Sequence, residues 1–290
     1  MALYSSPCKV NLILNILGPR PDGFHDLETL FFPVAVFDQL QVERGGGGFR
    51  FTCNTDRVPT GATNLVYRAA MFFFEKTKIQ PEGHIHLVKN LPTEAGLGAG
   101  SANAAFTLRA LNREFDHPLD GEQLRQIAAL LGSDVPFFLQ DAPAIGRGRG
   151  EKLEILGPFA ALSGSWIILI KPDFGVSTAW AYKELARYPA DQKGRPGRVK
   201  ELAQALTTGT LAECAPLFYN SLEAPVLPQY PLLAEYQKFL REAGADATLM
   251  SGSGSTTFAL VSSQRAAEKL VEQFKGRFGT SLWIAMAEVE

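Results

Sequence analysis

Hydrophobic and polar positions alternate near the start of the chain, and this alternation predicts a strand over residues 7–17. Its buried face would carry Val10, Leu12, Leu14 and Ile16. Lys9 and Asn11 would share the opposite face, about 6–7 Å apart along the strand. A lysine on a strand is usually solvated, but an amide beside it on the same outward face makes Lys9 a candidate functional residue.

Further elements of the first half follow from the same patterns. Alternation predicts a strand over 84–91, and a hairpin in which 39–44 and 49–54 flank the four glycines at 45–48. Spacings of three and four residues predict helices over 63–76, over 101–112, and between Asp120 and Gly132, where Gln123 completes a capping-box pattern. Glycine and proline mark predicted loops at 18–23 and 146–151.

From Ser165 a new series of hydrophobic periodicities typical of strands and helices begins, and it predicts a second domain. Strands are expected over 166–170, 247–250, 257–261 and 282–286, and helices over 177–185, 231–243 and 264–274, with two or three more before Leu227 and a polar connection at 191–198. This order suggests a split βαβ sandwich. We place the boundary near 157–163, which divides an α+β chain into domains 1–158 and 159–290.

Length and composition narrow the possible functions. A chain of 290 residues, of which 46% are hydrophobic, fits two domains with real cores. A net charge of -2 without a dense Lys/Arg run argues against nucleic-acid binding. The three cysteines are widely separated, which argues against disulfides and a zinc site and favours the cytoplasm. No signal peptide is evident, and no apolar run approaches the ~20 residues of a membrane span.

Between a predicted strand and a predicted helix lies a glycine-rich stretch, residues 92–102, which we call the glycine loop. Its glycines allow unusual backbone angles and leave backbone N–H groups accessible beside the positive end of a helix dipole. Such a turn binds anions, and phosphate is the obvious one, although a simple tight connection is the alternative. The sequences of a P-loop and of a dinucleotide-binding fingerprint are both absent.

Other candidate residues also have structural explanations. Phe24 could belong to the core, and His25 could be an ordinary polar residue. Asp134 could cap a short helix that carries Pro136 in its first turn, a role compatible with catalysis. The arginines of 146–151 could contact phosphate or solvent.

The glycine loop resembles the Pro-x-x-x-Gly-Leu-Gly-x-x-Ser-[Ser/Ala] loop of the GHMP kinases (galacto-, homoserine, mevalonate and phosphomevalonate kinases), where it wraps the phosphates of ATP. Five further segments resemble that family in the right order, the first four of them one of its branches and the fifth the family's third, glycine-rich motif. They are Pro-Cys-Lys-Val-Asn at 7–11, Arg-Pro-Asp-Gly-Phe-His at 20–25, Asn64-Leu65, Gly-Ser-Asp-Val-Pro at 132–136, and the small-residue run 251–255. The resemblance covers essentially the whole chain.

This branch acts on a methylerythritol linked to cytidine diphosphate, in the non-mevalonate route to isoprenoids. The resemblance implies a two-domain GHMP kinase fold, with an N-terminal domain like ribosomal protein S5 domain 2 and a ferredoxin-like C-terminal domain. It also implies ATP-dependent phosphorylation of the 2-hydroxyl group of that substrate. Asp134 would accept the proton of the tertiary alcohol, and Lys9, close to it, would screen charge on the transferring phosphoryl group.

Binding residues follow from the same resemblance. The cytidine side would be held by Asn11, Phe24, His25, Thr178 and Tyr182, of which Phe24 and Tyr182 would stack on the base. The ATP site would comprise Asn64, Leu65, Lys89, Pro92, Thr93, Glu94, Ala95, Gly96, Leu97, Gly98, Ala99, Gly100, Ser101 and Ala102. Mg²⁺ would arrive with ATP, with help from Ser101 and without a dedicated metal cage. We expect a small-molecule substrate, no nucleic-acid or membrane partner, and a monomer or weak homodimer.

Two departures from the branch affect these expectations. Glu94 and Ala95 stand where glycines are usual, and a carboxylate would repel phosphates, so we predict that Glu94 points away from them. Ala179 and Trp180 differ from the usual neighbours of Tyr182. Two other functions compete: another GHMP kinase, which would not need a base-stacking aromatic, and a non-catalytic nucleotide-binding relative, which would not need both Lys9 and Asp134.

Overall fold

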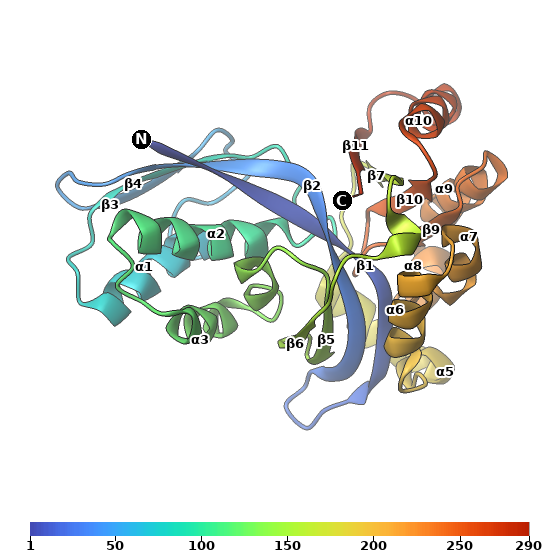
Figure 1. Ribbon diagram of the computed structural model, residues 1–290, viewed down its shortest axis with the longest axis horizontal. Coiled ribbons are helices and arrows are strands. Elements are labelled where there is room, and N and C mark those ends of the chain that lie inside the picture. Colours follow the sequence, from blue (N-terminus) through green and yellow to red (C-terminus); the bar gives the residue numbers. More distant parts are fainter. Residues whose placement is uncertain (290) are drawn as a thin grey trace. The chain divides into compact units, whose positions relative to one another are not determined.

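The computed structural model describes residues 1–289, which form two compact units. Unit 1 comprises Met1–Cys8, Phe37–Thr93 and Gly98–Asp141, and unit 2 comprises Lys9–Val36, Glu94–Leu97 and the chain from Ala142 onward. Two long strands, β1 (Ala2–Pro19) and β2 (His25–Glu43), contribute residues to both units. The two strands are neighbours in one sheet (Figure 1).

The sheet of unit 1 differs from the predicted hairpin. Residues 39–43 of β2 pair antiparallel with β4 (Gly83–Val88), and β4 pairs in parallel with β3 (Phe49–Cys53). The hairpin prediction was therefore wrong, because β4 lies between the two strands expected to pair. The four glycines between β2 and β3 are flexible enough for the chain to cross over β4 instead of forming a tight turn. The alternation of hydrophobic and polar residues in β2 and β3 does not specify which strand pairs with either.

Three helices complete unit 1 largely as predicted. Helix α1 (Leu65–Thr77) packs beside α2 (Ala99–Glu114), and α3 (Gly121–Leu131) packs against both (Figure 1). The Asn64 side chain caps α1, and Asp120 and Gln123 form the predicted capping box of α3. The short 3-10 helix η1 (Pro136–Leu139) is capped by Val135 without a side-chain bond, so the predicted N-cap role of Asp134 was wrong.

In unit 2, the first half of β2 pairs antiparallel with β5 (Ala144–Gly148), which in turn pairs with β6 (Lys152–Ile155). Strand β1 also pairs in parallel with the short β8 (Tyr219–Asn220). The predicted loop at 146–151 therefore begins as a strand. Gly146 makes this possible, because a Cβ atom there would lie 2.7 Å from the ring of Phe31 on the neighbouring strand.

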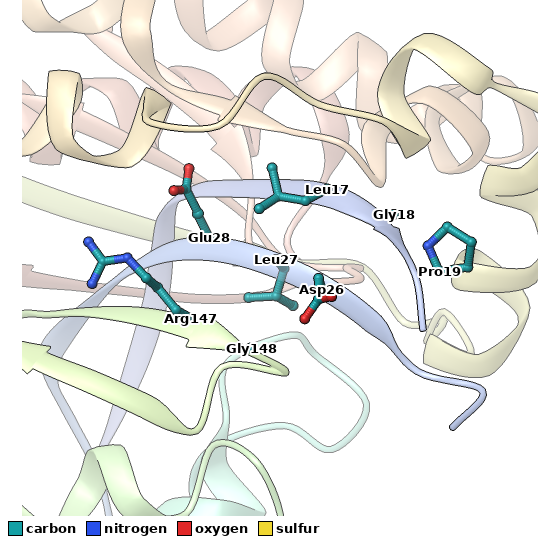
Figure 2. A pocket seen from close by; sticks show the side chains of 8 residues that line it. All are labelled: Leu17, Gly18, Pro19, Asp26, Leu27, Glu28, Arg147 and Gly148. Atoms are coloured by element: carbon teal, nitrogen blue, oxygen red, sulfur yellow. The ribbon is translucent and has the colours of Figure 1, made fainter. Parts of the chain in front are cut away.

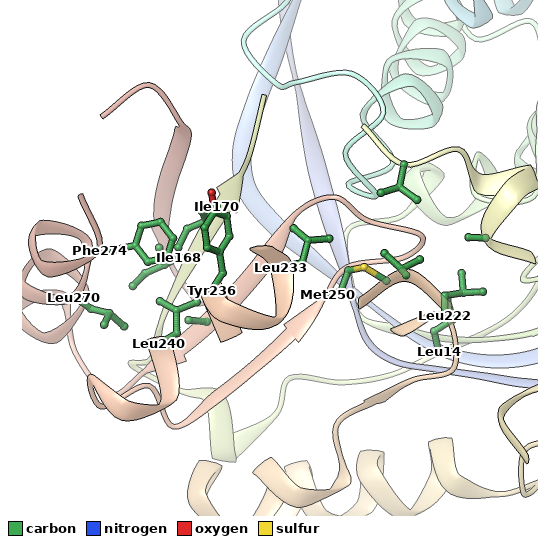
Figure 3. Packing of buried hydrophobic residues seen from close by; sticks show 14 of the residues in the cluster. Leu14, Ile168, Ile170, Leu222, Leu233, Tyr236, Leu240, Met250, Leu270 and Phe274 are labelled. Carbon is green, nitrogen blue, oxygen red and sulfur yellow. The ribbon is translucent and has the colours of Figure 1, made fainter. Parts of the chain in front are cut away.

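A second sheet of unit 2 confirms the predicted split βαβ order. Its strands are β7 (Trp166–Lys171), β9 (Ala247–Met250), β10 (Thr257–Val261) and β11 (Trp283–Glu288), arranged β11-β7-β10-β9 with antiparallel neighbours throughout. Helices α9 (Pro231–Glu242) and α10 (Gln264–Phe278) pack on it. Figure 3 shows the core they enclose, where Tyr236 lies edge-to-face with Phe274 among aliphatic side chains.

The remaining helices of unit 2 are short. They are α4 (Thr178–Glu184), α5 (Pro189–Gln192), α6 (Arg198–Thr208), α7 (Leu211–Cys214) and α8 (Glu223–Gln229), with 3-10 turns η2 (Ala160–Leu162), η3 (Leu185–Arg187) and η4 (Ala215–Leu217). The predicted polar connection therefore starts inside a helical turn, because Pro189 favours a helix start. Within residues 1–289, every helix is too short or too polar to span a bilayer.

Candidate functional site

Lys9 is buried, with 3% of its surface exposed, although its strand position suggested an outward face. Residues 8–16 of β1 are covered on both faces, so their alternation does not separate an inside from an outside. The Lys9 Nζ atom donates to Asn11 Oδ1 at 2.7 Å and to the carbonyl oxygen of Gly96 at 2.9 Å. A buried ammonium group is costly without such acceptors, so this environment indicates a functional lysine.

Asn11 is held in one orientation by its neighbours. Because an ammonium group only donates, the Asn11 atom facing Lys9 must be the amide oxygen. Its amide nitrogen donates to Thr29 Oγ1 at 2.7 Å, and that hydroxyl donates to the carbonyl of Ile13 at 2.7 Å. A fixed chain of donors and acceptors from β2 through Asn11 therefore positions the Lys9 amine.

The middle of the glycine loop, residues 94–97, belongs to unit 2 and is hydrogen-bonded through its carbonyl groups. The Gly96 carbonyl accepts from Ser251 Oγ at 2.9 Å as well as from Lys9. The Ala95 carbonyl accepts from the Thr256 amide at 3.2 Å, and the Leu97 carbonyl accepts from the Lys9 amide at 3.0 Å. The bonded carbonyls fix the path of the loop and leave its N–H groups for a ligand.

Gly96 is the loop position where a side chain is excluded. Its φ of +72° is rarely adopted by other residues, and a Cβ atom there would collide with the Ser251 carbonyl oxygen. We therefore expect Gly96→Ala to raise the KM for ATP about tenfold and to lower the melting temperature, because the loop must move to relieve the collision. Gly61→Ala, where the added methyl group meets nothing within 4 Å, is the matched control. An unchanged KM for ATP would contradict this expectation.

The glycine loop ends at the start of α2 without a side-chain cap. Gly98 is the N-cap residue, with φ +66°, and its carbonyl accepts from the Ala102 amide at 2.9 Å. Within the described chain, the backbone amides of residues 96–101 donate no hydrogen bond to protein groups. Several unpaired N–H groups thus gather at the positive end of a helix of 16 residues, which suits phosphate oxygens.

Unit 1 also contains the other predicted ATP-site residues and Asp134. The Asn64 side chain accepts from the Val66 amide at 2.8 Å and donates to the Pro59 carbonyl at 2.8 Å, while Leu65 begins α1. Lys89 forms a short ion pair with Asp38. Asp134 lies half-buried in the turn between α3 and η1. It belongs to unit 1 and Lys9 to unit 2, so their predicted convergence on one hydroxyl group stays a prediction.

The predicted cytidine-binding residues lie in unit 2, and two of them, His25 and Tyr182, are in ring contact. The rings of His25 and Tyr182 are 5.2 Å apart between centroids and tilted by 42°. Phe24 is 51% exposed, with the Arg149 guanidinium 4.8 Å from its ring centre. Thr178 Oγ1 and Ser253 Oγ share a hydrogen bond of 2.8 Å, which joins α4 to the 251–255 run. Burial lowers the pKa of His25 below its usual 6.5, which favours a neutral ring near pH 7.

Glu94 lies against the segment that follows β7. A Cβ atom on Gly175 would be 2.8 Å from Glu94 Cβ, so a side chain at position 175 would displace Glu94. The nearby Lys171 amine donates to the carbonyls of Pro172 and Phe174 at 2.8 and 2.9 Å. Burial lowers the pKa of Lys171, and the charges of Asp173 and Glu94 oppose this shift. Glu94 therefore has a place beside a lysine, and its orientation away from bound phosphates stays a prediction.

A separate pocket of about 320 Å³ opens between β1, β2 and β5 in unit 2 (Figure 2). It is lined by Leu17, Gly18, Pro19, Asp26, Leu27, Glu28, Arg147 and Gly148, of which only Arg147 was considered from the sequence, as an arginine that could contact phosphate or solvent. Most of its charged groups already have partners: Asp26 pairs with Arg20, and Arg147 pairs with Glu154.

Sequence reasoning missed three polar residues that support the site. Thr29 orients Asn11 through a hydrogen bond, and Asp38 accepts a hydrogen bond from the Lys89 amine. Asn220 donates to the carbonyls of Met250 and Gly252 at 2.8 and 2.7 Å, holding the start of the 251–255 run. A signal existed only for Asp38, which shares a strand face with Leu40 and Val42 and is therefore a charge at a core position. Within residues 1–289, no cluster of three or more metal-ligating side chains is present.

Two family models match the chain: the GHMP kinases N terminal domain over residues 64–142, and GHMP kinases C terminal over residues 199–280. Among curated relatives, 4-diphosphocytidyl-2-C-methyl-D-erythritol kinase of Pelotomaculum thermopropionicum is 37% identical over 268 residues, 92% of this chain and 91% of the relative. The enzyme of the same name from Geobacter sulfurreducens is 35% identical over 283 residues, 97% and 96% of the two chains.

Solved structures agree with the sequence relatives. A crystal structure of 4-(cytidine 5'-diphospho)-2C-methyl-D-erythritol kinase superposes with a TM-score of 0.79 at 33% identity, covering 98% of each chain. A homoserine kinase from Cytophaga hutchinsonii superposes with a TM-score of 0.73 at 22% identity, covering 97% of this chain and 94% of the other, which supports the fold alone.

Proposed function

Because the chain belongs to the GHMP kinase family, we propose that it phosphorylates the 2-hydroxyl group of 4-diphosphocytidyl-2-C-methyl-D-erythritol, with ATP as phosphate donor. The observation that carries this proposal is the identity of 35–37% to relatives named for that substrate, over more than nine-tenths of their length. The Phe24-His25 segment supports it, because an aromatic ring and an imidazole suit a nucleobase better than a small polar alcohol.

Phosphoryl transfer requires alignment and charge stabilisation more than covalent help. In the proposed reaction, the substrate hydroxyl oxygen bonds to the γ-phosphorus, the bond to the bridging oxygen breaks, and ADP leaves. Asp134 accepts the hydroxyl proton. Lys9 stabilises the charge on the transferring group, and its buried position with bonds to Asn11 and Gly96 supports a fixed cation in this role.

ATP binding is assigned to the glycine loop and to residues near it. The unpaired amides of residues 96–101 and the absence of a side chain at Gly96 fit a triphosphate. We assign the adenine side to Asn64, Leu65 and Lys89, as the family resemblance implies. Mg²⁺ supplies charge neutralisation when bound with ATP, and Ser101 is the residue we expect to help hold it.

The cytosine side is assigned to Asn11, Phe24, His25, Thr178 and Tyr182. We propose that Phe24 and Tyr182 stack on the base, and that Asn11 and His25 bond its edge. The ring contact between His25 and Tyr182 supports a shared role for these two side chains.

We expect the affinity for the cytidine substrate to depend on pH through His25. Its pKa lies below the usual 6.5 because of burial, so the ring is neutral above that value and gains a proton only as the pH falls through the lowered pKa. A protonated ring loses its acceptor atom, so the KM for the substrate should be constant at neutral and alkaline pH and rise as the pH falls through the lowered pKa. Steady-state kinetics of wild type and His25→Gln should show this rise only in wild type. A parallel rise in both proteins would assign it to another group.

The domain division at 158/159 remains a prediction, supported by family models that match on either side of it. The cytoplasmic location and a monomer or weak homodimer remain predictions as well. Within residues 1–289, Cys8, Cys53 and Cys214 form no disulfide with one another, which suits a reducing compartment.

The decisive experiment measures ADP formation with a panel of alcohols: 4-diphosphocytidyl-2-C-methyl-D-erythritol, homoserine, mevalonate and galactose. We expect turnover with the first, and competitive inhibition of that turnover by CDP. Turnover of another alcohol without inhibition by CDP would replace this proposal with another GHMP kinase. ATP binding without turnover of any alcohol would favour a non-catalytic relative.

A further inference from the structure

Asp38 is a wholly buried carboxylate in the half of β2 that belongs to unit 1, with 0% of its surface exposed. Its Oδ1 atom accepts from the backbone amides of Asn90 and Leu91, each at 2.8 Å. Its Oδ2 atom accepts from Lys89 Nζ in a short contact and from Asn103 Nδ2 at 3.0 Å. Each oxygen therefore receives two donors, and one of the four carries a full positive charge.

These donors stand at the two ends of the glycine loop. Residues 89–91 come immediately before Pro92, and Asn103 comes immediately after Ala102, in the first turns of α2. Asp38 is therefore bonded to the chain just before and just after residues 92–102. The Lys89 amide also donates to Asn54 Oδ1 at 2.8 Å, which fixes the first of these two ends from a second direction.

We propose that Asp38 is a positioning residue that holds both ends of the glycine loop at the separation needed to bind the triphosphate. The proposal deepens the proposed function and rests on the assignment of this loop to ATP phosphates. Asp38 does not touch the nucleotide in this role. It acts through the path of the backbone, which determines where the loop amides point.

The same contacts assign Lys89 a role in this arrangement. Its amine is bonded to Asp38 and its side chain is almost entirely buried, so its charge is already matched within the protein. The Lys89 ammonium group therefore holds the start of the loop through Asp38, and only the rest of this residue is left for the adenine contact that the family resemblance implies.

An asparagine at position 38 would keep the shape and remove this function. It has one acceptor oxygen, and its NH₂ group would face either two backbone amides or an ammonium and an amide, all of which are donors. At least one end of the loop would lose its bonds, and buried donors would be left unpaired. We therefore expect Asp38→Asn to loosen the loop rather than to remove a ligand contact.

The test compares Asp38→Asn with Asn112→Ser. Asn112 lies on α2, about 13 Å further along the helix axis than Asn103, and makes two hydrogen bonds to the backbone of Leu119. Its variant should lose stability without affecting the loop. ATP and adenosine affinities are measured by calorimetry at a temperature where circular dichroism shows every variant to be folded. We expect Asp38→Asn to weaken ATP binding by about 10- to 100-fold with little change for adenosine, and Asn112→Ser to change neither.

Three results would overturn the proposal: unchanged ATP affinity in Asp38→Asn, equal losses for ATP and adenosine, or equal losses in Asp38→Asn and Asn112→Ser. The double variant Asp38→Asn/Lys89→Met removes the unpaired ammonium as well. It should regain stability but not ATP affinity, because position 38 then has no bond to residue 89 and only one acceptor oxygen for the two backbone amides and Asn103. Recovered affinity would also contradict the proposal. These binding measurements need no alcohol substrate, so a failure of the proposed kinase reaction would not be confused with a failure of the loop.

Discussion

Replacing Asp134 by asparagine is expected to lower kcat by about 10²- to 10⁴-fold while leaving ATP affinity within about twofold of wild type. Asparagine has nearly the same size and shape but cannot accept the proton that the attacking hydroxyl releases. The loss should therefore lie in the chemical step. Single-turnover measurements of ADP formation, together with calorimetric titration of ATP, separate that step from binding.

Asp141→Asn is the matched control for this prediction. Asp141 lies in the same unit and is mostly exposed, and its partner Arg109 is partly exposed, so this surface ion pair contributes little to stability. We expect that variant to retain wild-type kcat. If Asp134→Asn also retained it, Asp134 would not be the base. If Asp134→Asn instead lost ATP affinity and stability together, its role would be structural.

Much of the fold could be predicted because local patterns agreed with the final packing. Helix α3 illustrates this agreement: Asp120, Gln123 and Gly132 marked its ends, and its capping box is present. The second sheet of unit 2 likewise has the strand order of the predicted split βαβ sandwich. In these regions the relevant contacts are local, or the partner strands follow a common connection rule.

The failed predictions concern partners that are distant in sequence. The regular alternation of β3 is compatible with pairing to β2 or β4, and only the assembled sheet selects β4. At 146–151, three glycines suggested a loop, yet Gly146 belongs to a strand because the ring of Phe31 fills the space of its missing side chain. The pattern at 39–54 does not show that β4 lies between β2 and β3, and the pattern at 146–151 does not show that Phe31 lies beside Gly146.

The candidate site was likewise predictable only in part. The glycine loop was evident from its composition, and the backbone amides of residues 96–101 are unpaired within residues 1–289. The burial of Lys9 was not evident, because the alternation of hydrophobic and polar residues along β1 suggested that one face of the strand is exposed to solvent. Thr29, Asn220 and Asp38 were missed because each acts by bonding another part of the site, and such supporting bonds leave no sequence motif of their own.

The effect of Lys9→Met should be almost as large as that of Asp134→Asn. We expect kcat to fall by about 10²- to 10³-fold, because a fixed cation in a water-poor site stabilises transition-state charge far more than a cation in water does. Methionine fills a similar volume without a charge, and a buried apolar group costs little, so the melting temperature should change by only a few degrees. Coupled ADP assays and thermal unfolding of the same preparations measure both quantities.

Lys152→Met is the control, because Lys152 is an exposed lysine of unit 2 on β6. Its kcat should equal that of wild type. Lys9→Arg sharpens the test: it keeps the charge but places a larger planar group where the Lys9 amine bonds Asn11 and Gly96, so its activity should stay low. Near-normal turnover of Lys9→Met would show that the charge at position 9 is unnecessary. A large loss of stability in Lys9→Met, with kcat unchanged for the folded fraction, would make Lys9 a structural residue. The charge on the transferring phosphoryl group would then be stabilised by the loop amides alone.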